Sequence, residues 1–212
     1  MNMITSLPHK AAFITELEAG GEQTIVTYGT SLTAGGAWVG HLRDELEGRF
    51  PGLAHVINSG AGGMWSQWGV ENLEERVIAK KPDAVFIEFS INDAFLEHKT
   101  STEDARRNLE TMIDRIVAAN AKCEIILMVM NPPTGASFEK RPLFVAYEDV
   151  YREVAARRGL RLIDHSHNWH AILKNEPLKW AEYVPDNIHP TAEGCEYVIT
   201  PFLLESIGFV RR

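Results

Sequence analysis

Short apolar runs rich in β-branched residues alternate along this chain with longer amphipathic stretches. The runs end at small or polar residues, which is typical of buried strands. They fall at residues 24–28, 54–58, 84–89, 124–130 and 160–163. The stretches between and after them have helical length and fall at residues 37–49, 68–80, 102–120, 144–158 and 192–205. This alternation predicts an α/β fold in which helices cover both faces of a parallel sheet.

The predicted elements follow one another without a clear break. No internal repeat, low-complexity block or long Pro/Gly/Ser linker divides the series. We therefore expect a single domain over residues 24–212, preceded by an N-terminal extension over residues 1–23. Within the extension, residues 10–17 are expected to form a short helix that lies on the domain or on another subunit. The extension and an exposed final segment at residues 209–212 leave room for subunit contacts in a homo-oligomer.

Composition narrows the choice of partners. At 212 residues the chain is long enough to bury a sizeable core without disulfides or a structural metal. Its formal net charge of −8 argues against a nucleic acid or an anionic membrane as partner, although a simple solubility role explains the charge equally well. The two cysteines, Cys123 and Cys195, lie in an apolar run and in a predicted helix. We interpret both as packing thiols in a reducing compartment.

The beginning of the sequence carries no obvious export signal. Residues 1–13 lack the basic start and the apolar core that secretion requires, and no apolar run approaches the length of a membrane span. A cytoplasmic protein without a membrane partner is the expectation from the sequence.

Candidate chemistry begins at the end of the first predicted strand, where the sequence GTSL occupies residues 29–32. In a parallel sheet the carboxyl ends of the strands share one rim, where ligands normally bind. This places the hydroxyl of Ser31 at that rim as a candidate nucleophile. Taken alone, the motif also fits an ordinary strand-to-helix turn with a capping serine.

An acid and a base follow much later, in the sequence DNIHP at residues 186–190. A serine hydroxyl is barely ionised at neutral pH, so it needs an imidazole such as His189 to take its proton. The imidazole needs its other nitrogen held as a donor, and Asp186 is close enough in sequence to fold back and accept that proton. A capping aspartate in a plain turn is the alternative interpretation.

Two further blocks end the second and third strands: NSGAGG at 58–63 and SIND at 90–93. With GTSL and DNIHP, in this order, they make the chain resemble the SGNH or GDSL-type serine hydrolases over nearly its whole length. The resemblance implies a flavodoxin-like α/β/α sandwich with a five-stranded parallel sheet of order 2-1-3-4-5. It also implies a catalytic triad of Ser31, His189 and Asp186, and no cofactor or metal.

The same resemblance assigns the oxyanion hole to the backbone N–H groups of Ser31 and Gly63 and to the side-chain amide of Asn92. Each such donor typically stabilises the transition state of a serine hydrolase by about 3 kcal/mol. Two positions depart from the family pattern. Thr30 replaces an acidic residue that is not part of the triad, and Ser90 stands where glycine is common, which affects the local turn rather than the role of Asn92.

Some polar residues have other interpretations. Glu88 lies inside an apolar strand and requires a polar partner there, either as a structural brace below the active-site loops or in a direct catalytic role. Asp93 is interpreted as structural. The histidines at 165, 167 and 170 resemble a metal cluster in composition, but their spacing matches no zinc pattern.

The substrate is inferred from tryptophans near the expected rim. Trp65 and Trp180 lie close in sequence to the oxyanion and acid/base blocks, and we expect them, with Ile188, to contact the substrate. Flat aromatic faces stack on sugar rings, whereas Trp38 and Trp68 fit helix packing equally well. No long apolar lid is evident, so a short acyl group is expected.

The leading hypothesis is therefore a serine esterase that removes acetyl or another short acyl group from a small-molecule or saccharide ester through an acyl-Ser31 intermediate. A lysophospholipase or thioesterase with the same machinery is one alternative. A non-catalytic glycan-binding protein on the same fold is another, although no triad residue is missing.

Overall fold

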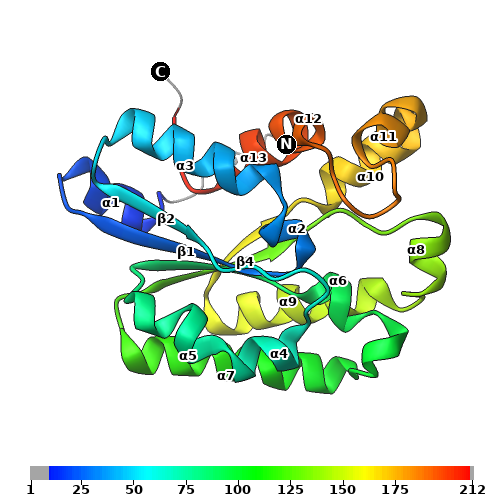
Figure 1. Cartoon of the computed structure of the whole chain (residues 1–212), viewed down its shortest axis with the longest axis horizontal. Coiled ribbons are helices and arrows are strands. Elements are labelled where there is room, and N and C mark those ends of the chain that lie inside the picture. Colours follow the sequence, from blue (N-terminus) through cyan, green and yellow to red (C-terminus); the bar gives the residue numbers. More distant parts are fainter. Residues whose placement is uncertain (1–9, 211–212) are drawn as a thin grey trace, which may run out of the picture.

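The computed structural model describes residues 10–210, and these build the predicted parallel sheet (Figure 1). The strands are β1 (Gln23–Gly29), β2 (Ala54–Asn58), β3 (Ala84–Glu88), β4 (Glu124–Val129) and β5 (Arg161–Asp164). All neighbours pair in parallel, in the order β2-β1-β3-β4-β5. This confirms the α/β fold class and the strand order 2-1-3-4-5 that the resemblance implied.

Helices cover both faces of the sheet (Figure 1). One face carries α1 (Ala12–Glu18), α3 (Ala37–Arg49), α10 (Ser166–Asn175), α11 (Pro177–Tyr183) and the run formed by α12 (Ala192–Gly194), the π-helical turn η3 (Cys195–Ile199) and α13 (Thr200–Ser206). The other face carries α4 (Ser66–Glu71), α5 (Leu73–Arg76), η1 (Ile78–Lys80), α7 (Thr102–Ala119) and α9 (Phe144–Arg158). Short helices at the rim are α2 (Ser31–Ala34), α6 (Ser90–Asp93), η2 (Leu96–His98) and α8 (Gly135–Glu139).

The central strand β3 shows how the two cores are separated. Ala84 and Phe86 point into the core under α1 and α3, whereas Val85 and Ile87 point into the core over α7 and α9. Side chains of a strand alternate between faces, so the next residue, Glu88, continues on the side of Ala84 and Phe86. A carboxyl group is thereby carried into an apolar layer directly below the rim.

Helix α1 belongs to the same core as the sheet. Its residues Phe13, Ile14 and Leu17 are buried, and the Phe13 ring meets Phe86 edge to face at 6.2 Å between centroids. The helix expected at residues 10–17 thus lies on the domain that contains the sheet. The remaining part of the expected extension, residues 1–9, lies outside the described residues.

The helices expected at 37–49 and 144–158 have those bounds in α3 and α9, but the one expected at 68–80 is wrong in form. That segment is divided into α4, α5 and η1. Asn72 stands at the first break, where its backbone N–H and its side-chain amide both donate to the Trp68 carbonyl oxygen, at 3.0 and 2.9 Å. Helices α10 and α11 lie in a region for which no helix was predicted.

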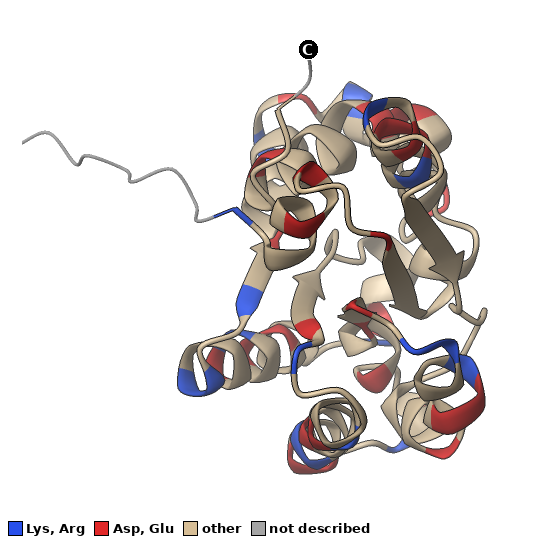
Figure 2. Ribbon diagram, turned by 90° about the vertical axis from the view of Figure 1, so that its left-hand side faces the viewer, with Lys and Arg blue, Asp and Glu red and all other residues tan. Residues whose placement is uncertain are grey.

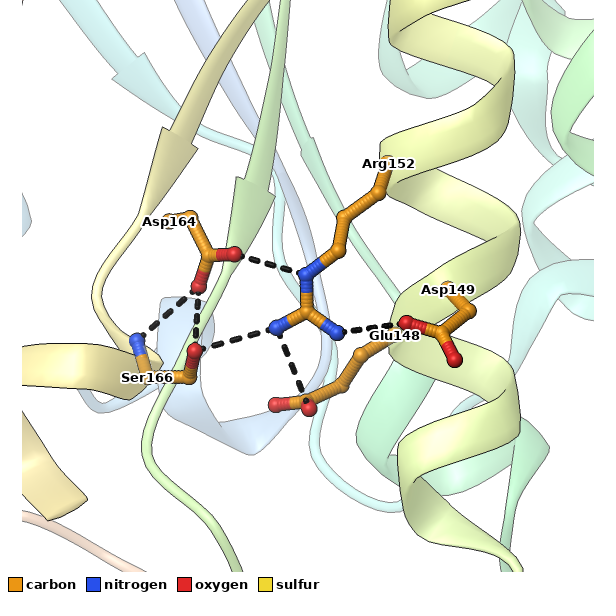
Figure 3. Close-up of polar contacts among 5 residues, drawn as sticks. All are labelled: Glu148, Asp149, Arg152, Asp164 and Ser166. Atoms are coloured by element: carbon orange, nitrogen blue, oxygen red, sulfur yellow. Dashed lines mark hydrogen bonds and ion pairs between the residues drawn. The ribbon is translucent and has the colours of Figure 1, made fainter.

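An ion cluster, in which only Glu148 is fully buried, joins helix α9 to the end of β5 (Figure 3). The guanidinium of Arg152 donates to Asp164 at 2.7 Å, to Asp149 at 2.8 Å, to Glu148 at 3.3 Å and to the hydroxyl of Ser166 at 3.0 Å. Glu148 is almost fully buried, and this burial raises its pKa to about 7 although Arg152 lies beside it. One arginine therefore holds three carboxylates against the rim side of β5.

Charged residues of both signs are interleaved along the outer helices, whereas the strands carry few of them (Figure 2). Within residues 10–210, no helix is both long and apolar enough to cross a membrane.

Candidate active site

The serine, histidine and aspartate singled out in the sequence meet at the rim of the sheet. Ser31 opens α2 immediately after β1, and its Oγ lies 2.8 Å from Nε2 of His189. The other imidazole nitrogen, Nδ1, lies 2.6 Å from Oδ2 of Asp186. Since a carboxylate only accepts, Nδ1 carries the proton and Nε2 is left as the acceptor for the serine hydroxyl. In this geometry an imidazole can take a proton from a hydroxyl.

Asp186 also shapes the turn that carries the histidine. Its Oδ1 accepts from the backbone N–H of His189 at 2.7 Å and of Ile188 at 3.0 Å. Burial by itself raises the pKa of Asp186, but the hydrogen bonds from His189 and Ile188 outweigh it and lower the pKa below its usual value. Asn187, between them, has a φ of 68°, a left-handed conformation that asparagine tolerates better than most residues. The carboxylate is therefore held ionised and in place.

The segment after β4 fixes this turn from the side. The backbone N–H of Thr134 donates to the Asn187 carbonyl oxygen at 3.0 Å, and the Thr134 hydroxyl donates to Asn187 Oδ1 at 2.9 Å. The amide of Asn131 donates to the Ile188 carbonyl oxygen at 2.9 Å. Neither Thr134 nor Asn131 was singled out in the sequence, because nothing in their local pattern indicates a contact more than fifty residues away.

A buried carboxyl group lies below the serine turn. Oε2 of Glu88 accepts from the Thr30 backbone N–H at 3.1 Å, from the Thr30 hydroxyl at 2.9 Å and from the Thr33 hydroxyl at 3.2 Å. Thr30 in turn caps α2, since its hydroxyl accepts from the Leu32 N–H. Gly29 permits the close approach, because a Cβ there would lie 2.4 Å from the Glu88 carbonyl oxygen.

Glu88 therefore contacts the residues that flank Ser31. It is 1% exposed, and burial raises its pKa from 4.5 to about 8, against the opposing effect of the hydrogen bonds from Thr30 and Thr33. The structure gives Glu88 the position of a brace below the turn, the first of the two roles that the sequence left open. Thr30, which departs from the family pattern, supplies two of its hydrogen bonds.

The NSGAGG block, which begins at the end of β2, packs against helix α2. Asn58 donates from Nδ2 to the carbonyl oxygens of Thr33 and Ala34 at 3.0 and 3.3 Å. Gly60 lies so close to α2 that a Cβ would come within 2.6 Å of the Ala34 nitrogen. Gly63, further along the loop, has a φ of 74° and is exposed at the rim. A glycine at this last position adopts the left-handed backbone without the strain that a Cβ would cause.

Asn92 and Asp93 lie in α6, at the end of β3. The Asn92 amide donates from Nδ2 to the Met64 carbonyl oxygen at 2.9 Å, and its Oδ1 accepts from Arg141 at 3.3 Å. Asp93 is buried and accepts from the Ser66 N–H at 2.9 Å. Burial raises the pKa of Asp93 to about 7. The contacts of Asp93 hold the loop beside Asn92 and agree with the structural interpretation.

A pocket of about 430 Å³ opens beside Ser31 and His189. Its wall is mostly apolar or small and comes from α2, the turn before α3, the loop after β2, the DNIHP block and the helical run that follows it. The lining residues are Ser31, Leu32, Ala34, Gly35, Gly36, Gly62, His189, Pro190, Cys195 and Ile199. Cys195, interpreted as a packing thiol, forms part of this wall.

The residues expected to touch substrate lie in different surroundings. Trp65 is half-buried and stacks on the imidazole of His98 at 4.2 Å between centroids. Trp180 is 5% exposed and packs edge to face on Trp169, so in this structure it offers no open face to a ligand. Ile188 is half-buried within the acid/base turn. None of the three lines the pocket beside Ser31.

The histidines at 165, 167 and 170 do not come together as a metal site. Among the residues that the structure describes, no group of three His, Cys, Asp or Glu side chains could hold a metal ion. His165 is fully buried in the core, and burial lowers its pKa to about 3. Its ring instead meets Phe202 edge to face at 5.4 Å.

Comparison with known proteins decides the family. The sequence model of the GDSL-like lipase/acylhydrolase family matches residues 26–197. The chain belongs to this family. It is accordingly a carboxylic ester hydrolase of the SGNH type, as the four motifs predicted. A search of curated proteins found no match.

Solved structures with the same fold include the acetylxylan esterase Axe2 from Geobacillus stearothermophilus. It is 24% identical, with a TM-score of 0.76 over 90% of this chain and 96% of that one. A variant of Axe2, described as an acetyl-xylooligosaccharide esterase, has a TM-score of 0.77 at the same identity over 91% and 98% of the two chains. LAE5, an α/β hydrolase from the metagenome of Lake Arreo, Spain, is also 24% identical, with a TM-score of 0.76 over 91% and 98%.

Proposed function

We propose that this hydrolase removes acetyl groups from a carbohydrate ester through a covalent acetyl-Ser31 intermediate. The observation that carries the proposal is the continuous hydrogen-bonded series from Ser31 through His189 to Asp186, with 2.8 and 2.6 Å between the bonded atoms. The series ends beside an open pocket at the rim. It supplies the nucleophile, the base and the orienting carboxylate that acyl transfer requires.

In the first step, Oγ of Ser31 attacks the ester carbonyl while His189 Nε2 takes its proton. Asp186 stabilises the imidazolium that forms. The carbonyl oxygen becomes an oxyanion, which accepts hydrogen bonds from the backbone N–H groups of Ser31 and Gly63 and from the free amide proton of Asn92. These donors stabilise the charge as it develops.

Collapse of the tetrahedral intermediate breaks the ester C–O bond. The imidazolium of His189 returns its proton to the departing sugar oxygen, and the acetyl group remains on Ser31. A water molecule then gives a proton to His189 as it attacks the acyl carbonyl. In the second collapse the bond between Oγ and the acyl carbon breaks, His189 returns the proton to Oγ, and acetic acid leaves and ionises to acetate.

The substrate assignment has separate support. Axe2 and its variant, which share the fold, are described as acetylxylan and acetyl-xylooligosaccharide esterases. Trp65 stands at the rim, where a ring face suits a sugar, although His98 already covers one side. The alternative, a longer acyl chain, is favoured by the apolar wall of the pocket beside Ser31. The preferred length of the acyl chain distinguishes an acetylesterase from a hydrolase of longer acyl esters.

The test compares acetylated xylo-oligosaccharides and glucose pentaacetate with p-nitrophenyl acetate and p-nitrophenyl decanoate. We expect kcat/KM to be higher for acetate than for decanoate, and release of acetate from at least one sugar ester. Ser31→Ala serves as the control and should abolish each activity while its thermal unfolding stays unchanged. Faster hydrolysis of decanoate would favour the acyl-chain alternative, and full activity of Ser31→Ala would refute the mechanism.

A further inference from the structure

Arg141 is a buried cation near the site that the sequence did not single out. It follows α8, its residue exposure is 7%, and no carboxylate of residues 10–210 lies within ion-pair distance of it. Its guanidinium lies 4.7 Å from the centroid of the Phe95 ring. Burying a charge is costly, and buried arginines are usually paired. The hydrogen bonds of Arg141 must therefore offset that cost.

Two of those hydrogen bonds go to consecutive residues of α6. Nε donates to the Ile91 carbonyl oxygen at 2.8 Å, and Nη2 donates to Oδ1 of Asn92 at 3.3 Å. A third, from Nη1 to the Ser137 carbonyl oxygen at 3.2 Å, anchors the guanidinium to α8. The planar group thus connects α8 to the turn that carries Asn92. Since arginine stays protonated, these donors persist over the whole working pH range.

The two neighbours of the Asn92 amide also fix which way it faces. A guanidinium only donates, so the atom beside Arg141 must be the oxygen Oδ1. A carbonyl only accepts, so the atom beside Met64 must be the nitrogen Nδ2, at 2.9 Å. One Nδ2 proton is used by Met64, and the second is left for another acceptor. With the amide turned over, Nδ2 would meet the cation and both contacts would be lost.

We propose that Arg141 is a positioning residue for the oxyanion hole. The proposal rests on the proposed function and gives Arg141 two effects on Asn92. Arg141 locks the amide of Asn92 with its free N–H toward the reacting carbonyl, and the charge of Arg141 polarises that N–H. Arg141 does not touch the substrate. Its effect therefore falls on the transition state, where the oxyanion forms, and passes entirely through Asn92.

The experiment is a double-mutant cycle of Arg141→Met and Asn92→Ala, measured by hydrolysis of p-nitrophenyl acetate. Removal of one oxyanion donor costs about 10²- to 10³-fold in kcat, so loss of its positioning should cost about 10- to 100-fold, with KM nearly unchanged. In the Asn92→Ala background, the same Arg141→Met change should alter kcat by less than about threefold. Arg43→Met, an arginine 57% exposed on α3, is the matched control and should keep full activity.

Equal losses in both backgrounds would overturn the proposal, because they would show a structural role independent of Asn92. Full kcat in Arg141→Met would overturn it as well. If Arg141→Met does not fold, Arg141→Lys is used in the same cycle, since it keeps the charge but cannot reach both α6 acceptors, and the same two outcomes apply. Failure of the proposed function would look different from failure of this proposal. In that case wild type itself would show no Ser31-dependent hydrolysis of p-nitrophenyl acetate.

Discussion

The buried carboxyl group of Glu88 makes a quantitative prediction about stability and pH. Burial raises the pKa of Glu88 from 4.5 to about 8 in the folded protein, although Thr30 and Thr33 donate hydrogen bonds to it. A raised acid pKa means that the folded state binds this proton more tightly than the unfolded state does. The resulting stabilisation is complete below pH 4.5 and is lost as the pH rises through about 8.

The size of the effect follows from the same rise in pKa. At about 1.4 kcal/mol per unit, a change from 4.5 to about 8 corresponds to at most about 5 kcal/mol of unfolding free energy. Glu88→Gln removes the titration and keeps an oxygen that can accept from Thr30. The variant should therefore lose much less stability than wild type between pH 5 and pH 9.

The assay is urea denaturation of wild type and Glu88→Gln from pH 5 to pH 9 at constant ionic strength. The difference in unfolding free energy, wild type minus variant, should fall by several kcal/mol across this range. Glu75→Gln, at an exposed position of α5, is the control and should give a curve parallel to that of wild type. Parallel curves for Glu88→Gln would refute the reasoning, because Glu88 would then titrate alike in the folded and unfolded states.

Three other changes test separate parts of the structure. Asp186→Asn should lower kcat by about 10⁴-fold without unfolding the protein, because the imidazole of His189 loses the acceptor that sets its tautomer. Activity near that of wild type in steady-state kinetics would contradict this role of Asp186. Thr30→Asp should be destabilised by about 2 kcal/mol in urea, more at pH 9 than at pH 6, because it places a second carboxylate beside Glu88. Thr30→Ser is the control and should remain within about 1 kcal/mol of wild type. Equal stability of the two variants would contradict this prediction. Arg152→Met should lose about 3 kcal/mol by the same assay, because Glu148 is left buried without its cation, and an unchanged midpoint would argue against the ion cluster as a stabilising element.

The strands and the longest helices could be predicted because their signals are local. Gly159 ends α9 with a φ of 63°, and Ser101 begins α7 with a capping box that it completes with Asp104. Such residues act within one turn of their own position. Helix α11 begins with a local signal of the same kind, Pro177 in its first turn, although no helix was predicted there.

The surroundings of the site depend on contacts that the sequence does not display. Trp180 stands close in sequence to the acid/base block, yet α11 turns it toward Trp169 and into the core. Sequence distance to a motif says nothing about the face on which a side chain lies. Arg141 was not predicted because it lies far from the motifs in sequence, yet it contacts Asn92, forty-nine residues away. The four motifs identify the reacting groups, and the side chains that orient them come from whichever segments pack alongside.

The central claim, that Ser31 is the nucleophile, is tested most directly by covalent trapping. The protein is treated with a fluorophosphonate probe, digested, and analysed by mass spectrometry to locate the adduct, with Ser31→Ala treated in parallel. We expect a single adduct on Ser31, concurrent loss of p-nitrophenyl acetate hydrolysis, and no labelling of the variant. An adduct on another residue, or hydrolysis that persists after Ser31 is fully labelled, would contradict the account.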